Sequence, residues 1–177
     1  IALRFNTIYD SDLVVPEPMI PKVGARVMGL DNPLVKMSKT YSDVRGHAIG
    51  LLDDPKEIER SIKRAVTDSG NDIRFSDSNE SAGINNLLSI YRVITEKSEK
   101  EIESEFANAR GYGDLIKEVA EVVIAELNPI KEKYNRLMTD VGELDRLLSS
   151  GAQKAEEISR ARLNQIKEAI GLVLPKH

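Results

Sequence analysis

Asp54-Pro55-Lys56-Glu57, at residues 54–57, is where the chain begins to follow helical rules. An aspartate followed by a proline predicts a helix start, because the carboxylate can cap the first turn and proline is tolerated at the first helical position. Glu57 completes a pattern similar to a capping box. Ile58 and Ile62 follow at helical spacing, so we expect a helix with one apolar face that ends near Thr67.

Helical patterns continue from this point to the end of the chain. Apolar residues recur at helical spacing over residues 82–95, 98–106, 114–138, 141–148 and 152–170. Ser98 and Glu101 form a second capping-box pattern. Gly151 is expected to separate the last two helices, and Pro129 is expected to kink the longest one. No segment after residue 53 reads as a strand, so residues 53–177 predict an all-helical bundle of five or six helices.

The same spacing predicts which side chains are buried. The stripe of the longest helix comprises Leu115, Val119, Val122, Val123, Leu127, Ile130, Tyr134 and Leu137. The stripe of the last helix comprises Ala152, Ala155, Ser159, Leu163, Ile166 and Ile170. We expect both stripes to face the core of the bundle.

Residues 1–52 are less regular than the rest. Residues 1–9 suit the end of an amphipathic helix, and the prolines that follow at 16, 18 and 21 favour an extended segment. Residues 27–30 read as a short buried strand or turn. The sequence begins at Ile1 without an initiator methionine, already inside a helical pattern. We therefore expect a longer protein whose N-terminal part is missing here, with residues 1–52 as the end of one domain and residues 53–177 as a second domain.

Composition excludes several classes of site. The 177 residues contain no cysteine, so disulfides and thiolate metal sites are excluded. The two histidines, His47 and His177, lie far apart in sequence and offer no zinc-type spacing. No apolar run is long enough to span a membrane. The net charge of −4 does not favour a general nucleic-acid binder, although a basic stripe can exist locally.

Lys36-Met37-Ser38-Lys39-Thr40, hereafter the lysine motif, carries the candidate chemistry. It lies between Pro33 and Gly46, and neither side reads as regular secondary structure. A lysine ammonium is a compact charge on a flexible stem, so two lysines three residues apart can converge on one polyphosphate. The alternative is an ordinary solvated loop.

The neighbours of the lysine motif resemble a known family. Residues 21–28 together with Met37-Ser38-Lys39 resemble the second signature loop of class I aminoacyl-tRNA synthetases, and their spacing is most similar to the tryptophanyl-tRNA synthetases. Similar stretches in the same order are Leu51-Leu52-Asp53-Asp54, Ala65-Val66-Thr67-Asp68-Ser69, Asn86-Leu87-Leu88-Ser89-Ile90-Tyr91, Gly111-Tyr112-Gly113-Asp114 and Gly151-Ala152-Gln153-Lys154-Ala155.

The resemblance implies a fold and an activity. It implies that residues 1–52 end a nucleotide-binding, Rossmann-like domain and that residues 53–177 form a mainly α, anticodon-binding helical domain. The activity that the resemblance implies is ATP- and Mg²⁺-dependent activation of L-tryptophan, followed by transfer to tRNA(Trp), in a cytoplasmic homodimer.

The resemblance also assigns roles to single residues. Lys36 and Lys39 are the catalytic residues, which stabilise the leaving pyrophosphate. The nucleotide contacts are Val27, Lys36, Met37, Ser38, Lys39 and Thr40. No protein metal site is expected. The family usually ends this loop in serine, and Thr40 keeps the hydroxyl while adding a methyl group.

Two alternatives stay open. The histidine–glycine signature of the family is absent from this sequence, so the chain alone is expected to be inactive. A tyrosyl-tRNA synthetase has a similar loop, and a stand-alone helical module that binds tRNA or a partner protein is the alternative outside the enzymes.

For tRNA, Arg160 and Lys167 are candidate contacts, because they share a face of the last helix away from its apolar stripe.

Overall fold

The computed structural model describes residues 1–41, 44, 46–67, 70–76 and 78–173. The chain forms two compact units. One, unit 1, comprises residues 1–19 and 135–177, and the other, unit 2, comprises residues 20–134. The described residues form six α-helices, two 3₁₀ turns and no strand, so the prediction of a mainly α chain is confirmed.

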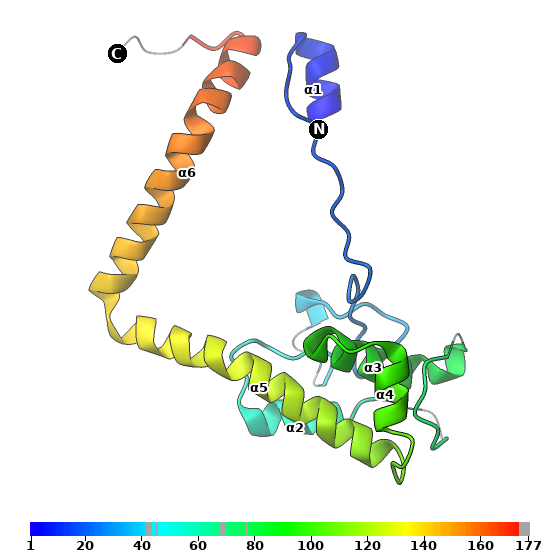
Figure 1. The fold of residues 1–177 in the computed structure, drawn as a ribbon. Helices are drawn as coiled ribbons and strands as arrows, with labels where there is room; N and C mark the ends of the chain where they lie inside the picture. The colour runs from blue at the N-terminus through cyan, green and yellow to red at the C-terminus, as the bar shows by residue number, and fades with distance from the viewer. Residues whose placement is uncertain (42–43, 45, 68–69, 77, 174–177) are drawn as a thin grey trace. The chain divides into compact units, whose positions relative to one another are not determined.

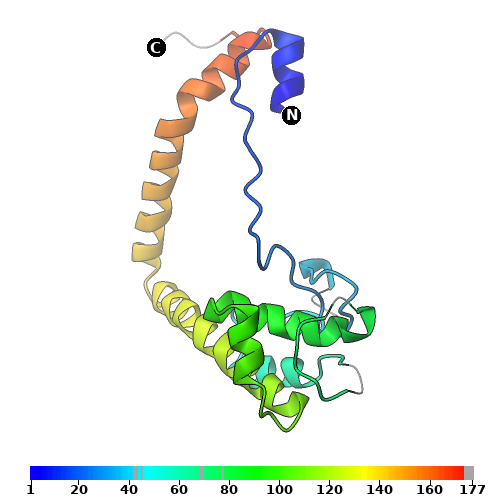
Figure 2. The same ribbon diagram turned by 45° about the vertical axis from the view of Figure 1, so that its right-hand side comes forward.

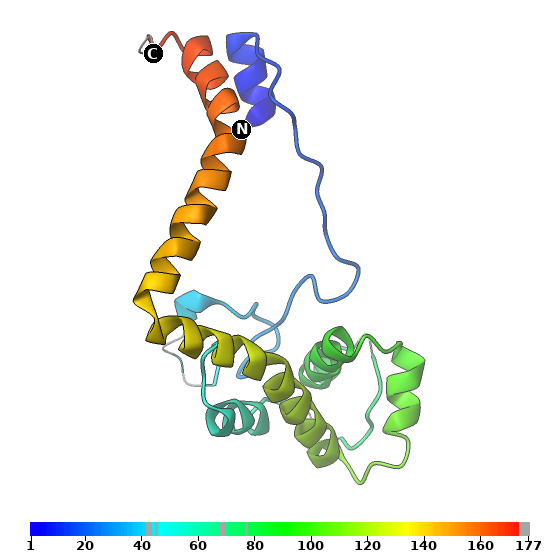
Figure 3. The same cartoon turned by 60° about the vertical axis from the view of Figure 1, so that its left-hand side comes forward.

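Unit 2 contains the core (Figure 1). Its helices are α2 (Pro55–Lys63), α3 (Ala82–Thr95), α4 (Glu99–Glu105) and the part of α5 (Tyr112–Thr139) up to residue 134. The 3₁₀ turns are η1 (Lys39–Tyr41) and η2 (Asn79–Ser81). The fully buried aliphatic side chains include Ile58, Ile62, Ile84, Leu87, Leu88, Ile102, Leu115 and Val119. All four helices therefore contribute to one apolar cluster, with α2, α3 and α4 gathered along the first half of α5 (Figure 3).

The segment ahead of α2 also reaches this core. Leu30 is 1% exposed, and Met37 packs against the cluster from the lysine motif. The Leu30 carbonyl accepts a hydrogen bond of 2.8 Å from the backbone of Val66. Burial of Leu30 thus fixes the segment that precedes the lysine motif to the helices of unit 2.

Local helix signals are confirmed at two of the predicted starts. Helix α3 has the predicted bounds, and Ser98 and Glu101 form the predicted capping box at the start of α4. The prediction for Asp54 is wrong in part, because Asp54 is the N-cap residue but its side chain makes no capping hydrogen bond. The Asp54 carboxylate instead accepts from Lys131 of α5, and this bond to an ammonium holds the pKa of Asp54 below its ordinary value.

Unit 1 contains α1 (Ala2–Tyr9) and α6 (Val141–Ala169). The predicted break at Gly151 is wrong, because α6 is one continuous helix (Figure 2). A single helical glycine costs only about 1 kcal/mol relative to alanine, which the surrounding turns outweigh. An ion pair of 3.3 Å joins Arg162 of α6 to Asp12, which follows α1.

Burial of the long apolar stripes is confirmed for the first half of α5 and is predicted wrongly for the rest of α5 and for α6. No described residue of α6 is buried, and Leu163 remains 47% exposed. In α5, Leu115, Val119 and Val123 are buried, whereas Ile130 and Tyr134 are exposed. No helix among the described residues is both long and apolar enough to cross a membrane.

Candidate functional site

The lysine motif is supported by a short antiparallel stem, which we define as residues 27–37. The Met37 amide donates to the Val27 carbonyl at 3.0 Å, and the Gly29 amide donates to the Val35 carbonyl at 2.8 Å. Met28 and Lys36 form the bridge between these two bonds. The stem therefore fixes the backbone position of Lys36 opposite Met28.

A tight turn closes the stem. The Asn32 carbonyl accepts from the Val35 amide at 3.1 Å, and the Asn32 side chain accepts from the Leu34 amide at 3.1 Å. This side-chain bond two residues ahead is the turn chemistry typical of asparagine. The turn returns the chain directly to Lys36.

Beyond the stem the chain enters η1. The Ser38 hydroxyl accepts from the Thr40 amide at 3.2 Å, and the Ser38 carbonyl accepts from the Tyr41 amide at 3.1 Å. Lys36 and Lys39 are exposed, and neither forms an ion pair with another described residue. The two ammonium groups are therefore available to an anionic ligand.

The six predicted nucleotide contacts lie on the stem, at Ser38 directly after it, and on η1. Val27 and Met37 are adjacent through their backbone bond, and both are partly buried. Lys39 and Thr40 follow on η1 and are exposed. The arrangement presents two cations and two hydroxyls beside a half-buried apolar pair, which suits a ligand with a polyphosphate and an aromatic base.

Asn86 of α3 is a structural residue of this site that the sequence pattern did not single out. The residue is 5% exposed, and its side chain donates to the Met28 carbonyl and accepts from the Met28 amide, both at 2.9 Å. The available signal was an asparagine within the apolar face of a helix. A buried amide needs partners, and here both partners are backbone groups of the stem.

His47 and Asp31 are the second pair that the pattern did not identify. His47 is 3% exposed, and its Nδ1 lies 2.6 Å from Asp31 Oδ1. The His47 carbonyl accepts from the Leu30 amide at 3.1 Å, and the Tyr41 ring meets the imidazole edge-on, with centroids 5.3 Å apart. His47 thus joins the chain that follows the lysine motif to Leu30 and Asp31, which precede it.

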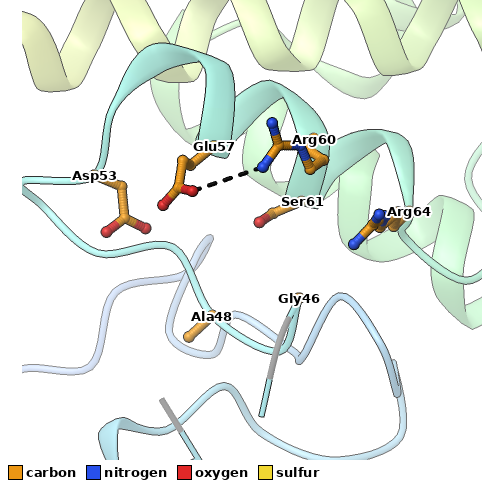
Figure 4. A pocket seen from close by; sticks show the side chains of 7 residues that line it. All are labelled: Gly46, Ala48, Asp53, Glu57, Arg60, Ser61 and Arg64. Atoms are coloured by element: carbon orange, nitrogen blue, oxygen red, sulfur yellow. Dashed lines mark ion pairs between the residues drawn. The ribbon is translucent and has the colours of Figure 1, made fainter. Parts of the chain in front are cut away.

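A polar cavity of about 200 Å³ lies where the loop returns to α2 (Figure 4). Gly46 and Ala48 line one wall, and the other lining residues are Asp53, Glu57, Arg60, Ser61 and Arg64. Glu57 and Arg60 form an ion pair of 3.6 Å, whereas Arg64 has no carboxylate partner among the described residues. The cavity carries balanced charge, so by itself it does not define an anion site.

No group of three or more potential metal ligands occurs among the described residues. A divalent cation at this site would depend on ligand oxygens supplied by its substrate. Mg²⁺ commonly binds in that way, through substrate phosphates and water.

Comparison with known proteins places the chain in a family. The model of a protein family described as "tRNA synthetases class I (W and Y)" matches residues 1–128 of this chain. These residues include the whole stem, the lysine motif and Asn86. The chain belongs to this family of class I tRNA synthetases.

Similar curated proteins of the synthetase family are tryptophan–tRNA ligases. The protein of Helicobacter pylori is 47% identical over 173 residues, which are 98% of this chain and 51% of that protein. The protein of Bacillus subtilis is 41% identical over 97% of this chain and 51% of its own length. The chain therefore spans about half the length of the curated relatives it matches.

Solved structures of tryptophanyl-tRNA synthetases share the fold. The structure from Mycoplasma pneumoniae has a TM-score of 0.84 at 26% identity and matches 97% of this chain and 52% of its own. The structure from Campylobacter jejuni in complex with ADP and tryptophan has a TM-score of 0.63 at 27% identity, over 97% of this chain and 51% of its own.

Proposed function

We propose that the protein containing this chain is a tryptophan–tRNA ligase. It activates L-tryptophan with ATP and transfers the amino acid to tRNA(Trp). The observation that carries the proposal is the lysine motif, held at the end of a hydrogen-bonded stem in a chain 47% identical to a tryptophan–tRNA ligase. The Campylobacter jejuni relative in complex with ADP and tryptophan supports the two small substrates.

The residues of the lysine motif and its stem suit the chemistry of adenylate formation. The carboxylate of tryptophan attacks the α-phosphorus of ATP, the bond to the bridging oxygen breaks, and pyrophosphate leaves with that electron pair. Lys36 and Lys39 stabilise the charge that develops on the leaving group. Ser38 and Thr40 offer hydroxyl hydrogen bonds, and the backbone of Val27 and Met37 lies along the adenine. Mg²⁺ bound to the phosphates would neutralise further charge.

The experiment replaces each lysine in the full-length protein. Lys36→Ala and Lys39→Ala should each slow tryptophan-dependent ATP–pyrophosphate exchange by about 10²–10³-fold, or ~2.7–4 kcal/mol, if these charges act as other oxyanion stabilisers do. Tryptophan affinity should stay unchanged, because the charges act mainly in the transition state. Lys56→Ala is the matched control, since Lys56 is exposed on the nearby α2. Unchanged turnover with a raised KM would contradict the assignment.

The alternatives predict different results in the same assay. Exchange that depends on tyrosine instead of tryptophan would support a tyrosyl-tRNA synthetase. A full-length protein that binds tRNA without any exchange would support a non-catalytic module. The curated relatives, which are tryptophan–tRNA ligases, favour the first reading over both.

The rest of the proposal follows the resemblance to the family. Residues 1–52 end the nucleotide-binding domain, and residues 53–177 form the anticodon-binding domain. The full-length enzyme is a cytoplasmic homodimer, and the chain alone is inactive because the histidine–glycine signature of the family is absent from it. The length that the chain covers in its relatives, about half, supports this last point.

A further inference from the structure

The stem of the lysine motif cannot hold its own position. Only two backbone hydrogen bonds join its two sides, those from Met37 to Val27 and from Gly29 to Val35. A two-stranded ribbon on its own is marginally stable at best in water. The precise placement of Lys36 and Lys39 therefore depends on contacts between the stem and the rest of unit 2.

The first such contact is the bidentate bond between Asn86 and Met28. Both polar groups of the Asn86 amide are used, and both polar backbone groups of Met28 are satisfied, so the side chain acts like one residue of a neighbouring strand. Met28 is also the bridge partner of Lys36. Helix α3 is thereby connected to the first catalytic lysine through a single intervening residue.

The second contact is the pair formed by His47 and Asp31. Asp31 precedes the lysine motif and His47 follows it, so their bond ties the two ends of the loop together. The fit is close: a Cβ added at Gly29 would lie 2.5 Å from His47 Cε1. The second ring nitrogen of His47, Nε2, is buried and has no hydrogen-bond partner. This imidazole is consequently held by Asp31 and by packing, including the edge of Tyr41 from η1.

We propose that Asn86 and His47 are positioning residues for the lysine motif. Asn86 fixes Met28, the bridge partner of Lys36, and His47 fixes the chain that follows the motif to Asp31, which precedes it. Neither residue lies on the motif itself. The inference rests on the proposed function, since it assigns them to the step in which Lys36 and Lys39 stabilise the leaving pyrophosphate. It also gives α3, a helix of the predicted anticodon-binding domain, a role in adenylate formation.

The test for Asn86 uses the full-length protein and two independent readouts. Asn86→Leu removes both bonds at similar volume, and Asn86→Asp keeps the acceptor for the Met28 amide while losing the donor. Asn86→Leu should lower kcat for ATP–pyrophosphate exchange by about tenfold to a hundredfold, because small displacements of reacting groups cost rates of this order. Tryptophan affinity should not change. Hydrogen–deuterium exchange of residues 27–37 should accelerate, with Asn86→Asp between wild type and Asn86→Leu in both readouts.

The test for His47 uses a pair of amides. His47→Asn places a donor near the position of Nδ1 and should retain most of the activity, whereas His47→Gln places its amide further out and should not. Ile102→Ala is the control for simple destabilisation, since Ile102 is fully buried on α4. No backbone hydrogen bond joins α4 to the described residues of 27–47.

The outcomes separate this inference from the proposed function. If the wild-type protein shows no exchange activity, the proposed function fails, while the protection of residues 27–37 still reports on the anchoring. If Asn86→Leu leaves that protection unchanged, the anchoring is wrong. If kcat falls no further in Asn86→Leu and His47→Gln than in Ile102→Ala, the positioning role is wrong.

Discussion

Glu101 shows at the scale of a single residue how the ends of these helices respond to pH. The Ser98 hydroxyl and the Ser98 amide both donate to the Glu101 carboxylate, and these bonds hold the pKa of Glu101 below its ordinary value. A carboxyl with a lowered folded-state pKa stabilises the fold above its unfolded-state pKa, about 4.3 for glutamate, and this contribution is lost as the pH falls through the folded-state pKa.

The expected result follows from that sign. Wild type should lose stability on acidification from neutral pH to below pH ~4, and Glu101→Gln should lose less over the same range, because glutamine can complete the capping box without titrating. Thermal unfolding of both proteins at several pH values measures the difference. Equal slopes for the two proteins would show that the capping carboxylate does not titrate with folding.

Polar contacts between near neighbours in the sequence could be predicted, whereas contacts between distant residues could not. The capping box of α4 could be predicted because Ser98 and Glu101 are three residues apart and their geometry follows from the helix itself. Asn86 and Met28 are 58 residues apart, so their bond depends on how α3 packs against the stem. The lysine motif could be predicted from its own residues and from the resemblance to a family. Asn86 and His47, which hold its stem, could be identified only from the three-dimensional structure.

Two glycines offer a matched test at the scale of the helix. A Cβ added at Gly83, in the first turn of α3, would lie 1.9 Å from the Val66 carbonyl oxygen, whereas nothing lies within 4 Å of one added at Gly151 in α6. Alanine is favoured over glycine in a helix by roughly 1 kcal/mol. Gly151→Ala should therefore stabilise the protein by about that amount, and Gly83→Ala should destabilise it by about 1–3 kcal/mol through overpacking.

Urea denaturation of both variants against wild type measures these changes. Stabilisation by Gly83→Ala would mean that the backbone of Val66 moves away freely, and a loss of stability for Gly151→Ala would mean that α6 is bent or broken there. The predicted break at Gly151 is wrong because α6 continues through this residue. The variant should stabilise the helix because nothing lies within 4 Å of the added Cβ. A glycine in a sequence does not reveal whether the helical turns on both sides of it are stable enough for the helix to continue.

Charge is segregated at the scale of the whole molecule. Residues 151–177 contain five Lys or Arg against three acids, while residues 95–126 contain four against nine. Composition alone gives only the total of −4, which is why it could not predict a binding surface. The structure adds that two of the basic residues are paired, Arg160 with Glu156 and Arg162 with Asp12. Lys167 forms no ion pair with any described residue.

Arg160 and Lys167 remain the candidate tRNA contacts on α6. They are seven residues apart, which places them near one face of the helix. The ion pair of Arg160 with Glu156 is exposed, and such pairs contribute little, so a phosphate can replace the carboxylate at small cost. If both side chains contact phosphates, Arg160→Glu/Lys167→Glu should weaken tRNA binding and flatten its dependence on log salt by about 1–2, since fewer counterions are released.

The control for this variant is Lys100→Glu/Lys117→Glu, which makes the same change in net charge within the acidic segment. Binding of tRNA(Trp) to the full-length protein, measured from low to moderate salt, compares the two with wild type. The control should lose little affinity and keep the wild-type slope, and neither variant should alter ATP–pyrophosphate exchange, because that step needs no tRNA. Equal losses in both variants would reduce the effect to total charge, since long-range attraction depends on charge wherever it lies, whereas contact with a phosphate depends on these two positions.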